Sequence, residues 1–333
     1  MTKTKIEWAT DVWNPTVGCT KISQGCKNCY AERIYERFHP NEKFTSEVRL
    51  FLERLDQPLH WKKPRRIFVD SMSDLFHESI DQPFIAQVFA TMAIAKWHTF
   101  IILTKRPKRM FEILGDLTFD KDIELWQEQM CFVEGWCSQD FDYPLPNVWL
   151  GVSAEDQKTA NERIPWLLKT PAVVKFVSVE PMLEKIDLYR SIQVSGDDDV
   201  WDEINAQEDV DGESEPEQFI EECEAECDWV NYGNDLVVNP EWYEWERNRN
   251  NIARFKVMKR DLLWVICGCE SGQQARPMDL DWARSLRDQC QAAEVPFFLK
   301  QANIDGKLVK MPAIDGEIWD KYPIIDNNYI ENR

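Results

Sequence analysis

The chain has 333 residues, and its hydrophobic fraction of 44% is enough for one large α/β domain or two smaller ones. It lacks both a run of about 18 apolar residues and a secretory leader, so we expect a cytoplasmic protein with no membrane partner. The formal net charge of −20 argues against nonspecific nucleic-acid binding through a broad basic face, but it leaves a specific nucleic-acid substrate open.

The first predicted elements surround a loop that contains three cysteines. Residues 12–18 form a short apolar segment just before the first cysteine. Residues 29–38 are predicted to be a helix, because Tyr30, Ile34 and Phe38 recur at helical spacing. We assign residues 12–30 to an amino-terminal cysteine loop.

Short apolar strands then alternate with helices along the chain. The predicted strands are 66–70, 98–104, 147–153, 172–179, 262–268 and 295–300. The predicted helices are 81–95, a segment opening at Pro107, 155–168 and 279–292. This alternation is typical of a parallel sheet covered on both faces. Six to seven such units favour a partial or complete TIM-like β/α barrel, and a doubly wound open sheet is the alternative.

One acidic segment interrupts this pattern. Residues 191–250 hold 20 Asp and Glu residues against 2 Arg, a net charge of −18, so the remainder of the chain carries only −2. Such a composition predicts a solvated insertion with little core of its own. We therefore expect one barrel domain built from residues 1–190 and 251–310, followed by a tail at 311–333.

The three cysteines Cys19, Cys26 and Cys29 have the spacing C-x6-C-x2-C. Three thiolates from one loop leave a coordination position open, which suits an iron–sulfur cubane with one iron free for another ligand. Structural zinc prefers four protein ligands, and no fourth Cys or His lies close by. A zinc site completed by a distant residue and an ordinary loop with three cysteines are the alternatives. Cys223 and Cys227 in the acidic segment are either a second metal site or incidental.

Polar side chains follow every predicted strand. Active sites of β/α barrels collect at the carboxyl ends of the strands, so these residues together predict a polar pocket on one rim. In chain order they are Asp70, Ser71, Ser73, Asp74, Thr104, Lys105, Arg106, Ser153, Glu155, Glu180, Glu270, Ser271, Arg276, Lys300 and Gln301. For Asp74 and Glu155, capping of the following helix is the alternative.

The string Asn-Pro-x-x-Gly-Cys…Gly-Cys-x-x-Cys-Tyr-Ala, residues 14–31, resembles the cluster loop of radical S-adenosylmethionine proteins, particularly the branch near spore photoproduct lyase. The chain resembles more closely a phage and bacterial family of proteins of unknown function that carries this three-cysteine loop. Further matching segments are 103–107, 149–153, 178–181, 269–277 and 297–301. Only the acidic segment falls outside the resemblance.

The resemblance implies an enzyme with a [4Fe-4S] cluster held by Cys19, Cys26 and Cys29, and with S-adenosylmethionine bound to the free iron. Reductive cleavage of S-adenosylmethionine would then modify a substrate, for which we expect a nucleotide or nucleic acid, with an electron donor as partner. Two features depart from the usual pattern. The first spacing is three residues longer than the common C-x3-C, and Asn28 stands where an aromatic residue usually precedes the third cysteine.

Within this interpretation the polar strand ends have expected roles. The catalytic candidates are Lys105, Glu180 and Glu270. The cofactor-binding candidates are Ser153, Thr104, Tyr30 and Asp70. The candidates for binding an anionic substrate group by charge-assisted bonds are Arg276, Lys300 and Arg106.

Two other functions fit the same sequence. One is a non-enzymatic binding or adaptor protein of phage or bacterial origin, stabilised by zinc or by an iron–sulfur cluster. Its acidic segment would be a docking surface or a mimic of nucleic-acid charge. The other is a cluster protein that transfers electrons to a partner.

Overall fold

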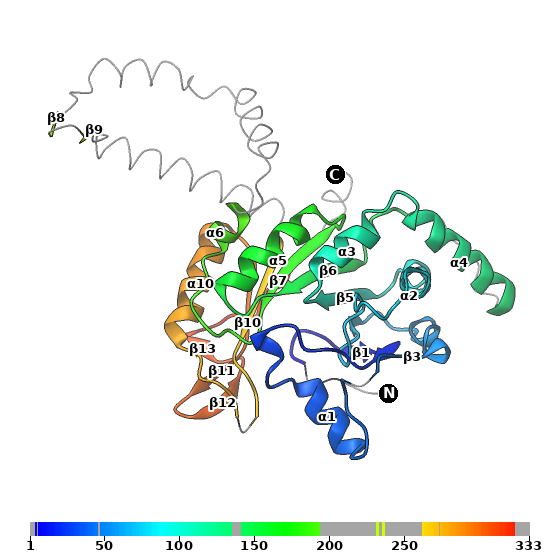
Figure 1. The fold of residues 1–333 in the computed structure, drawn as a ribbon, viewed down its shortest axis with the longest axis horizontal. Coiled ribbons are helices and arrows are strands. Elements are labelled where there is room, and N and C mark those ends of the chain that lie inside the picture. The colour runs from blue at the N-terminus through cyan, green and yellow to red at the C-terminus, as the bar shows by residue number, and fades with distance from the viewer. Residues whose placement is uncertain are drawn as a thin grey trace.

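A curled sheet of eight strands forms the centre of the protein in the computed structural model (Figure 1). The structure describes residues 4, 6–45, 47–134, 141–193, 231–232, 235–236, 262–272 and 274–323. Most of the acidic segment, including Cys223 and Cys227, lies outside the described residues.

The strand order in the sheet follows the chain. The strands are β1 (Asp11–Trp13), β4 (Arg66–Val69), β5 (Thr99–Thr104), β6 (Val148–Ser153), β7 (Val174–Val179), β10 (Trp264–Gly268), β11 (Phe297–Ile304) and β12 (Lys307–Lys310). Neighbours from β1 to β11 are parallel, and β12 pairs antiparallel with β11. A doubly wound sheet would reverse its strand order. The order without a reversal is that of a partial β/α barrel.

The six strands predicted from the sequence are all present, but the sheet has two more. β1 contains only three residues and lies partly in the segment predicted as merely apolar. β12 turns back from β11 across Gly306, whose positive φ of 74° suits a tight turn. Neither strand has the long apolar run by which the others were predicted.

Helices connect the parallel strands, and several of them lie along the sheet (Figure 1). They are α1 (Tyr30–Phe38), α2 (Gln82–Ile94), α3 (Pro107–Leu114), α4 (Phe119–Glu134), α5 (Gln157–Lys169), α6 (Leu188–Gln193) and α10 (Leu280–Ala292). Three short 3-10 turns are η1 (Gln24–Cys26), η2 (Leu52–Arg54) and η3 (Gln57–His60). The remaining strands form two-residue pairs: β2 (Thr16–Val17) with β3 (Arg49–Leu50), β8 (Asn231–Tyr232) with β9 (Asp235–Leu236), and β13 (Ala313–Ile314) with β14 (Glu317–Ile318). In the described ranges, every helix falls short of the length and apolar character needed to cross a bilayer.

The helix caps show whether Asp74 and Glu155 cap a helix, which is the alternative role given above for both residues. Asp81 accepts a hydrogen bond from Phe84 N at 3.1 Å and caps α2. The cap of α5 is Asp156, which forms a capping box with Thr159, so Glu155 is not the cap. Asp74 caps no helix and instead accepts from the Thr104 hydroxyl at 2.7 Å. Asp74 and Glu155 are therefore available for the rim of the sheet.

The two faces of the sheet carry different side chains. One face packs against the helices in a large aliphatic core. The opposite face carries an aromatic cluster that includes Phe68, Trp149, Phe176, Trp264 and Phe298, with Trp8 packed against it.

The aromatic face becomes polar toward the carboxyl ends of its strands. Because side chains alternate along a strand, Ser153 follows Trp149 and Glu180 follows Phe176 on this same face. Lys300 follows Phe298 in the same way. This face, which we call the inner face, is therefore aromatic in its middle and polar at its rim, the carboxyl ends of the strands.

Candidate functional site

The cysteine loop lies against the carboxyl ends of the parallel strands. Three separate groups of side chains fix it there, one after β5, one after β6 and one after β10. Each group contains a charged residue that the sequence places at a strand end. The predicted rim and the cysteine loop are therefore in contact and form one candidate site.

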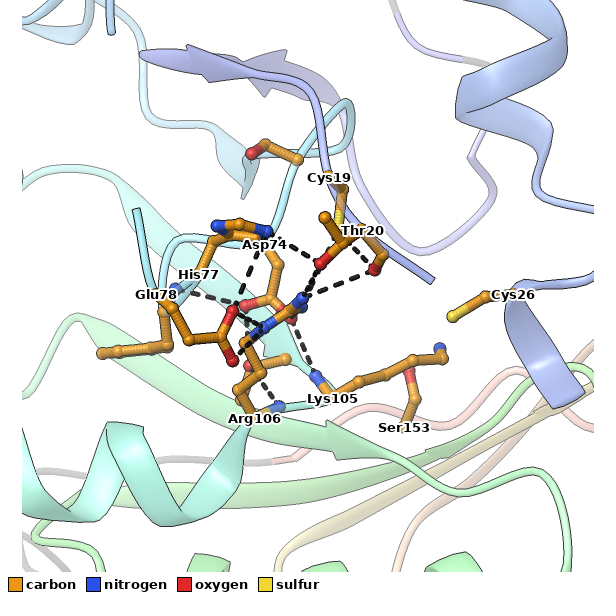
Figure 2. Close-up of polar contacts among 12 residues, drawn as sticks. Cys19, Thr20, Cys26, Asp74, His77, Glu78, Lys105, Arg106 and Ser153 are labelled. Atoms are coloured by element: carbon orange, nitrogen blue, oxygen red, sulfur yellow. Dashed lines mark hydrogen bonds and ion pairs between the residues drawn. The ribbon is translucent and has the colours of Figure 1, made fainter. Parts of the chain in front are cut away.

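The first group fixes the loop near Cys19 (Figure 2). Arg106 Nη1 lies 3.7 Å from Cys19 Sγ, and its Nη2 donates to Thr20 Oγ1 at 2.8 Å. The same guanidinium pairs with Asp74 at 3.0 Å and with Glu78 at 2.9 Å. Arg106 therefore joins the loop to two carboxylates.

Thr104 and His77 complete this first group. The Thr104 hydroxyl donates to Asp74 and accepts from Arg106 N at 2.8 Å. His77 is buried, and its Nε2 lies 2.9 Å from Thr20 Oγ1. Thr104 thus positions Asp74 and Arg106, whereas His77 contacts the loop itself at Thr20.

The second group fixes the segment between Cys19 and Cys26. Glu155, which follows β6, is fully buried and pairs with Arg163 of α5 at 2.8 Å. Its other carboxylate oxygen accepts from the Ser23 hydroxyl and from Gly25 N, the latter at 3.1 Å. Gly25 belongs to the 3-10 turn η1, so Glu155 binds the turn that ends at Cys26.

The third group fixes the loop beside Cys29. Asn28 Nδ2 donates to Glu270 at 2.9 Å, and Arg276 pairs with the same carboxylate while its Nη2 donates to Gln24 O at 2.8 Å. Burial opposes ionisation of Glu270, but bonds from Arg276 and Asn28 outweigh it and lower the pKa to about 2. Glu270 is therefore a carboxylate with its charge already compensated.

The three cysteines are free, half-buried thiols. Burial and the nearby Asp74 carboxylate raise the pKa of the Cys19 thiol to about 12. Burial also acts on Cys26, but the Lys105 ammonium and hydrogen bonds from Ile22 and Ser23 outweigh it and lower the pKa of that thiol. Among the described residues, no group of three or more His, Cys, Asp or Glu is placed to hold one metal ion.

Lys105 extends from the end of β5 toward Cys26, with Ser153 beside it (Figure 2). Its backbone N donates to Asp74 at 3.1 Å, which fixes the base of the side chain. Within the described ranges its ammonium forms no ion pair with a carboxylate. Ser153 is buried at the end of β6. The two side chains together offer a cation and a hydroxyl beside the cysteine loop.

Glu180 and Lys300 form an ion pair across the inner face. Lys300 Nζ lies 3.2 Å from both carboxylate oxygens of Glu180. Gly268 makes this possible, because a Cβ at that position would overlap the Glu180 carboxylate. The Ser178 hydroxyl lies 3.4 Å from the same carboxylate.

Asp70 and Tyr30 lie at the base of the cysteine loop. Asp70 accepts from Thr16 N at 3.0 Å, while its other oxygen is buried without a hydrogen-bond partner among the described residues. Burial raises the pKa of Asp70 to about 8. Tyr30 is partly exposed, and its hydroxyl donates to Ser71 O at 2.6 Å.

The structure thus brings most of the predicted site residues around one loop and fixes several of them by pairing. Sequence reasoning missed Arg163, Thr20 and Ser23. Arg163 reads as an ordinary helix residue, and nothing local to it indicates that it meets Glu155. The capping box at Asp156 was the available signal, because it frees Glu155 from the cap.

Comparison with known proteins gives one match. The model of the family described as "Protein of unknown function (DUF5131)" matches residues 3–323. No curated protein and no solved structure shows significant similarity to the chain. The match covers nearly the whole chain, and the protein belongs to the DUF5131 family.

Proposed function

We propose that this protein is an iron–sulfur enzyme of the radical S-adenosylmethionine type. Cys19, Cys26 and Cys29 would hold a [4Fe-4S] cluster, and S-adenosylmethionine would bind at the polar rim beside it. The resemblance of residues 14–31 to radical S-adenosylmethionine cluster loops motivates the proposal. When bound, the cluster would supply the electron for cleavage of S-adenosylmethionine.

The observation that carries the proposal is the attachment of the cysteine loop to the rim. Arg106, Glu155 and Glu270 follow three different strands, and each binds a different part of the loop. A loop whose three cysteines bound nothing would not need to be fixed at three points. Attachment at three points holds the loop at the carboxyl ends of the strands, where substrates of such folds bind.

The residues around the thiols fit a thiolate-bound cluster. A single zinc ion needs four ligand atoms within about 2.3 Å of one point, whereas the ligands of a cubane sit on different iron atoms. The three thiols belong to one short loop, and as ligands of a cubane they would leave one iron open. Lys105 and Arg106 place two cations next to Cys26 and Cys19, where they would offset thiolate charge.

The rim residues divide into three groups. Lys105 and Ser153 are suited to bind the carboxylate of S-adenosylmethionine, since Lys105 has a cation to offer and Ser153 a hydroxyl. Glu180 and Lys300 present both charges on the inner face, where they would orient an anionic substrate such as a nucleotide or nucleic acid. Glu270, Arg276 and Arg106 are occupied by the loop, so we assign them to positioning.

Anaerobic reconstitution with iron and sulfide tests the cluster directly. We expect about four irons per wild-type chain, a brown colour, and loss of both in Cys26→Ala. Cys290→Ala is the matched control, because Cys290 is a buried thiol of α10 outside the loop. A colourless protein with one zinc per chain would contradict the proposal and favour a metal-stabilised binding protein.

A further inference from the structure

The segment between Cys19 and Cys26 is longer than the spacing common in the loops that this one resembles. The additional length must be folded so that Cys26 still returns to the other two cysteines. In the structure the segment closes in the 3-10 turn η1, in which Cys26 N donates to Ser23 O at 3.0 Å. A 3-10 turn of three residues has little stability of its own, so its position must come from elsewhere.

Glu155, which comes from a different part of the chain, fixes the position of this turn. One carboxylate oxygen binds Arg163, and the other accepts from Ser23 and Gly25. The side chain is fully buried, so the loop supplies hydrogen bonds that water would otherwise make. Glu155 is not needed to cap α5, because Asp156 does so.

The absence of a side chain at Gly25 is part of the same arrangement. A Cβ at this position would lie 2.8 Å from both Cδ and Oε1 of Glu155. Gly25 therefore lets the turn approach the carboxylate closely enough for the backbone bond. This is a requirement of close approach, since the backbone of Gly25 does not have a positive φ.

We propose that Glu155 is the positioning residue of the lengthened segment, and that it determines where Cys26 Sγ sits relative to the other two cysteines. Arg163 orients the carboxylate, while Ser23 and Gly25 transmit its position to Cys26. The inference rests on the proposed function, because the position of Cys26 matters through the cluster it would bind.

Two loop variants test this without removing either partner of the buried Glu155–Arg163 ion pair. Gly25→Ala places a methyl group against Glu155, and Ser23→Ala removes one of the two bonds. Gln24→Ala is the matched control, because Gln24 is exposed and binds Arg276 only through its backbone oxygen. Gly25→Ala is the sharper variant, since Ser23 Oγ also lies 3.8 Å from Cys26 Sγ.

The readouts are the rate of iron loss to a chelator after anaerobic reconstitution and the electron paramagnetic resonance spectrum of the reduced protein. We expect Gly25→Ala and Ser23→Ala to lose iron about tenfold faster than wild type and to shift the spectrum, as for other residues that orient metal ligands. The metal-free variants should remain folded, and Gln24→Ala should match wild type throughout.

Glu155→Gln completes a cycle with Ser23→Ala. If Glu155 acts through Ser23 and Gly25, the two substitutions together should accelerate iron loss by less than the product of their separate effects. Should Glu155→Gln fail to fold, because Arg163 is left unpaired, the two loop variants decide the matter alone.

The outcomes separate the two proposals. If wild type binds iron and Gly25→Ala and Ser23→Ala retain it with an unchanged spectrum, the role of Glu155 is wrong while the proposed function stands. If wild type itself takes up no iron, the proposed function fails, and the role of Glu155 toward a cluster fails with it.

Discussion

Lys105 and Arg106 are consecutive residues at the end of β5, yet they serve different cysteines. Arg106 turns to Cys19, where its guanidinium lies 3.7 Å from the sulfur and is held by Asp74. Lys105 extends to Cys26 and lowers the pKa of that thiol. Arg106 is fixed in place by its partners, whereas Lys105 keeps its charge available. Substitutions of the two residues should therefore have different effects.

Arg106→Met should destabilise the protein. It leaves the buried Asp74 carboxylate without its cation and detaches Thr20, and breaking such a buried pair costs about 3–5 kcal/mol. Urea denaturation of the metal-free protein measures the loss. Lys108→Met is the control, because its exposed pair with Glu112 at 3.8 Å should contribute less than about 1 kcal/mol. Equal midpoints for the two variants would contradict this role of Arg106.

Lys105→Met should leave the stability almost unchanged but weaken the binding of S-adenosylmethionine. Loss of one charge-assisted hydrogen bond corresponds to about a tenfold increase in Kd. Calorimetric titration of the reconstituted protein measures the affinity, with Lys108→Met again as the control. An unchanged Kd would remove Lys105 from the binding site.

Asp70→Asn should stabilise the protein at pH 8 and have little effect at pH 4. The pKa of Asp70 is raised from 3.8 to about 8 in the folded state. Between these two values the unfolded chain ionises the group while the folded chain keeps it protonated. Keeping Asp70 protonated in the folded protein therefore lowers the free energy of unfolding by an amount that grows as the pH rises from about 4 to about 8.

Asparagine avoids this cost and tolerates the positive φ of 55° at this position. Each kcal/mol gained should raise the melting temperature by about 2–4 °C. Thermal melts of wild type and Asp70→Asn across this pH range provide the measurement. A melting-temperature difference that is independent of pH would show that Asp70 is ionised in the folded protein.

The Glu180–Lys300 pair should show strong coupling. Lys300→Met leaves a mostly buried carboxylate without its cation, whereas the double variant with Glu180→Gln removes the charge as well. We expect Lys300→Met alone to cost about 1–3 kcal/mol of unfolding free energy and the double variant to recover part of it. Denaturant unfolding of both single variants and the double variant completes the cycle. Additive effects would mean that the two residues do not interact.

The fold was largely predictable because its signals are local. Apolar runs such as residues 98–104 and 147–153 indicate strands by themselves, and polar residues at their ends indicate a rim. The strands that were missed, β1 and β12, have no such run. Their pairing depends on neighbours far along the chain, which local patterns do not encode.

The site was predictable only in outline. The sequence predicts that Glu270 and Arg276 lie on the rim, but not that they neutralise each other and hold Asn28. Likewise, Glu155 lies eight residues before Arg163, and their meeting depends on how β6 leads into α5. Such pairings decide which charges on the rim remain unpaired, so residue type alone overestimates the number of available cations among the described residues.

The most direct test of the central claim is formation of 5′-deoxyadenosine. The reconstituted protein is reduced anaerobically with dithionite in the presence of S-adenosylmethionine, and the product is quantified by liquid chromatography. Our account predicts 5′-deoxyadenosine with wild type and Cys290→Ala, and none with Cys26→Ala. A reduced, iron-loaded wild-type protein that forms no 5′-deoxyadenosine would contradict it.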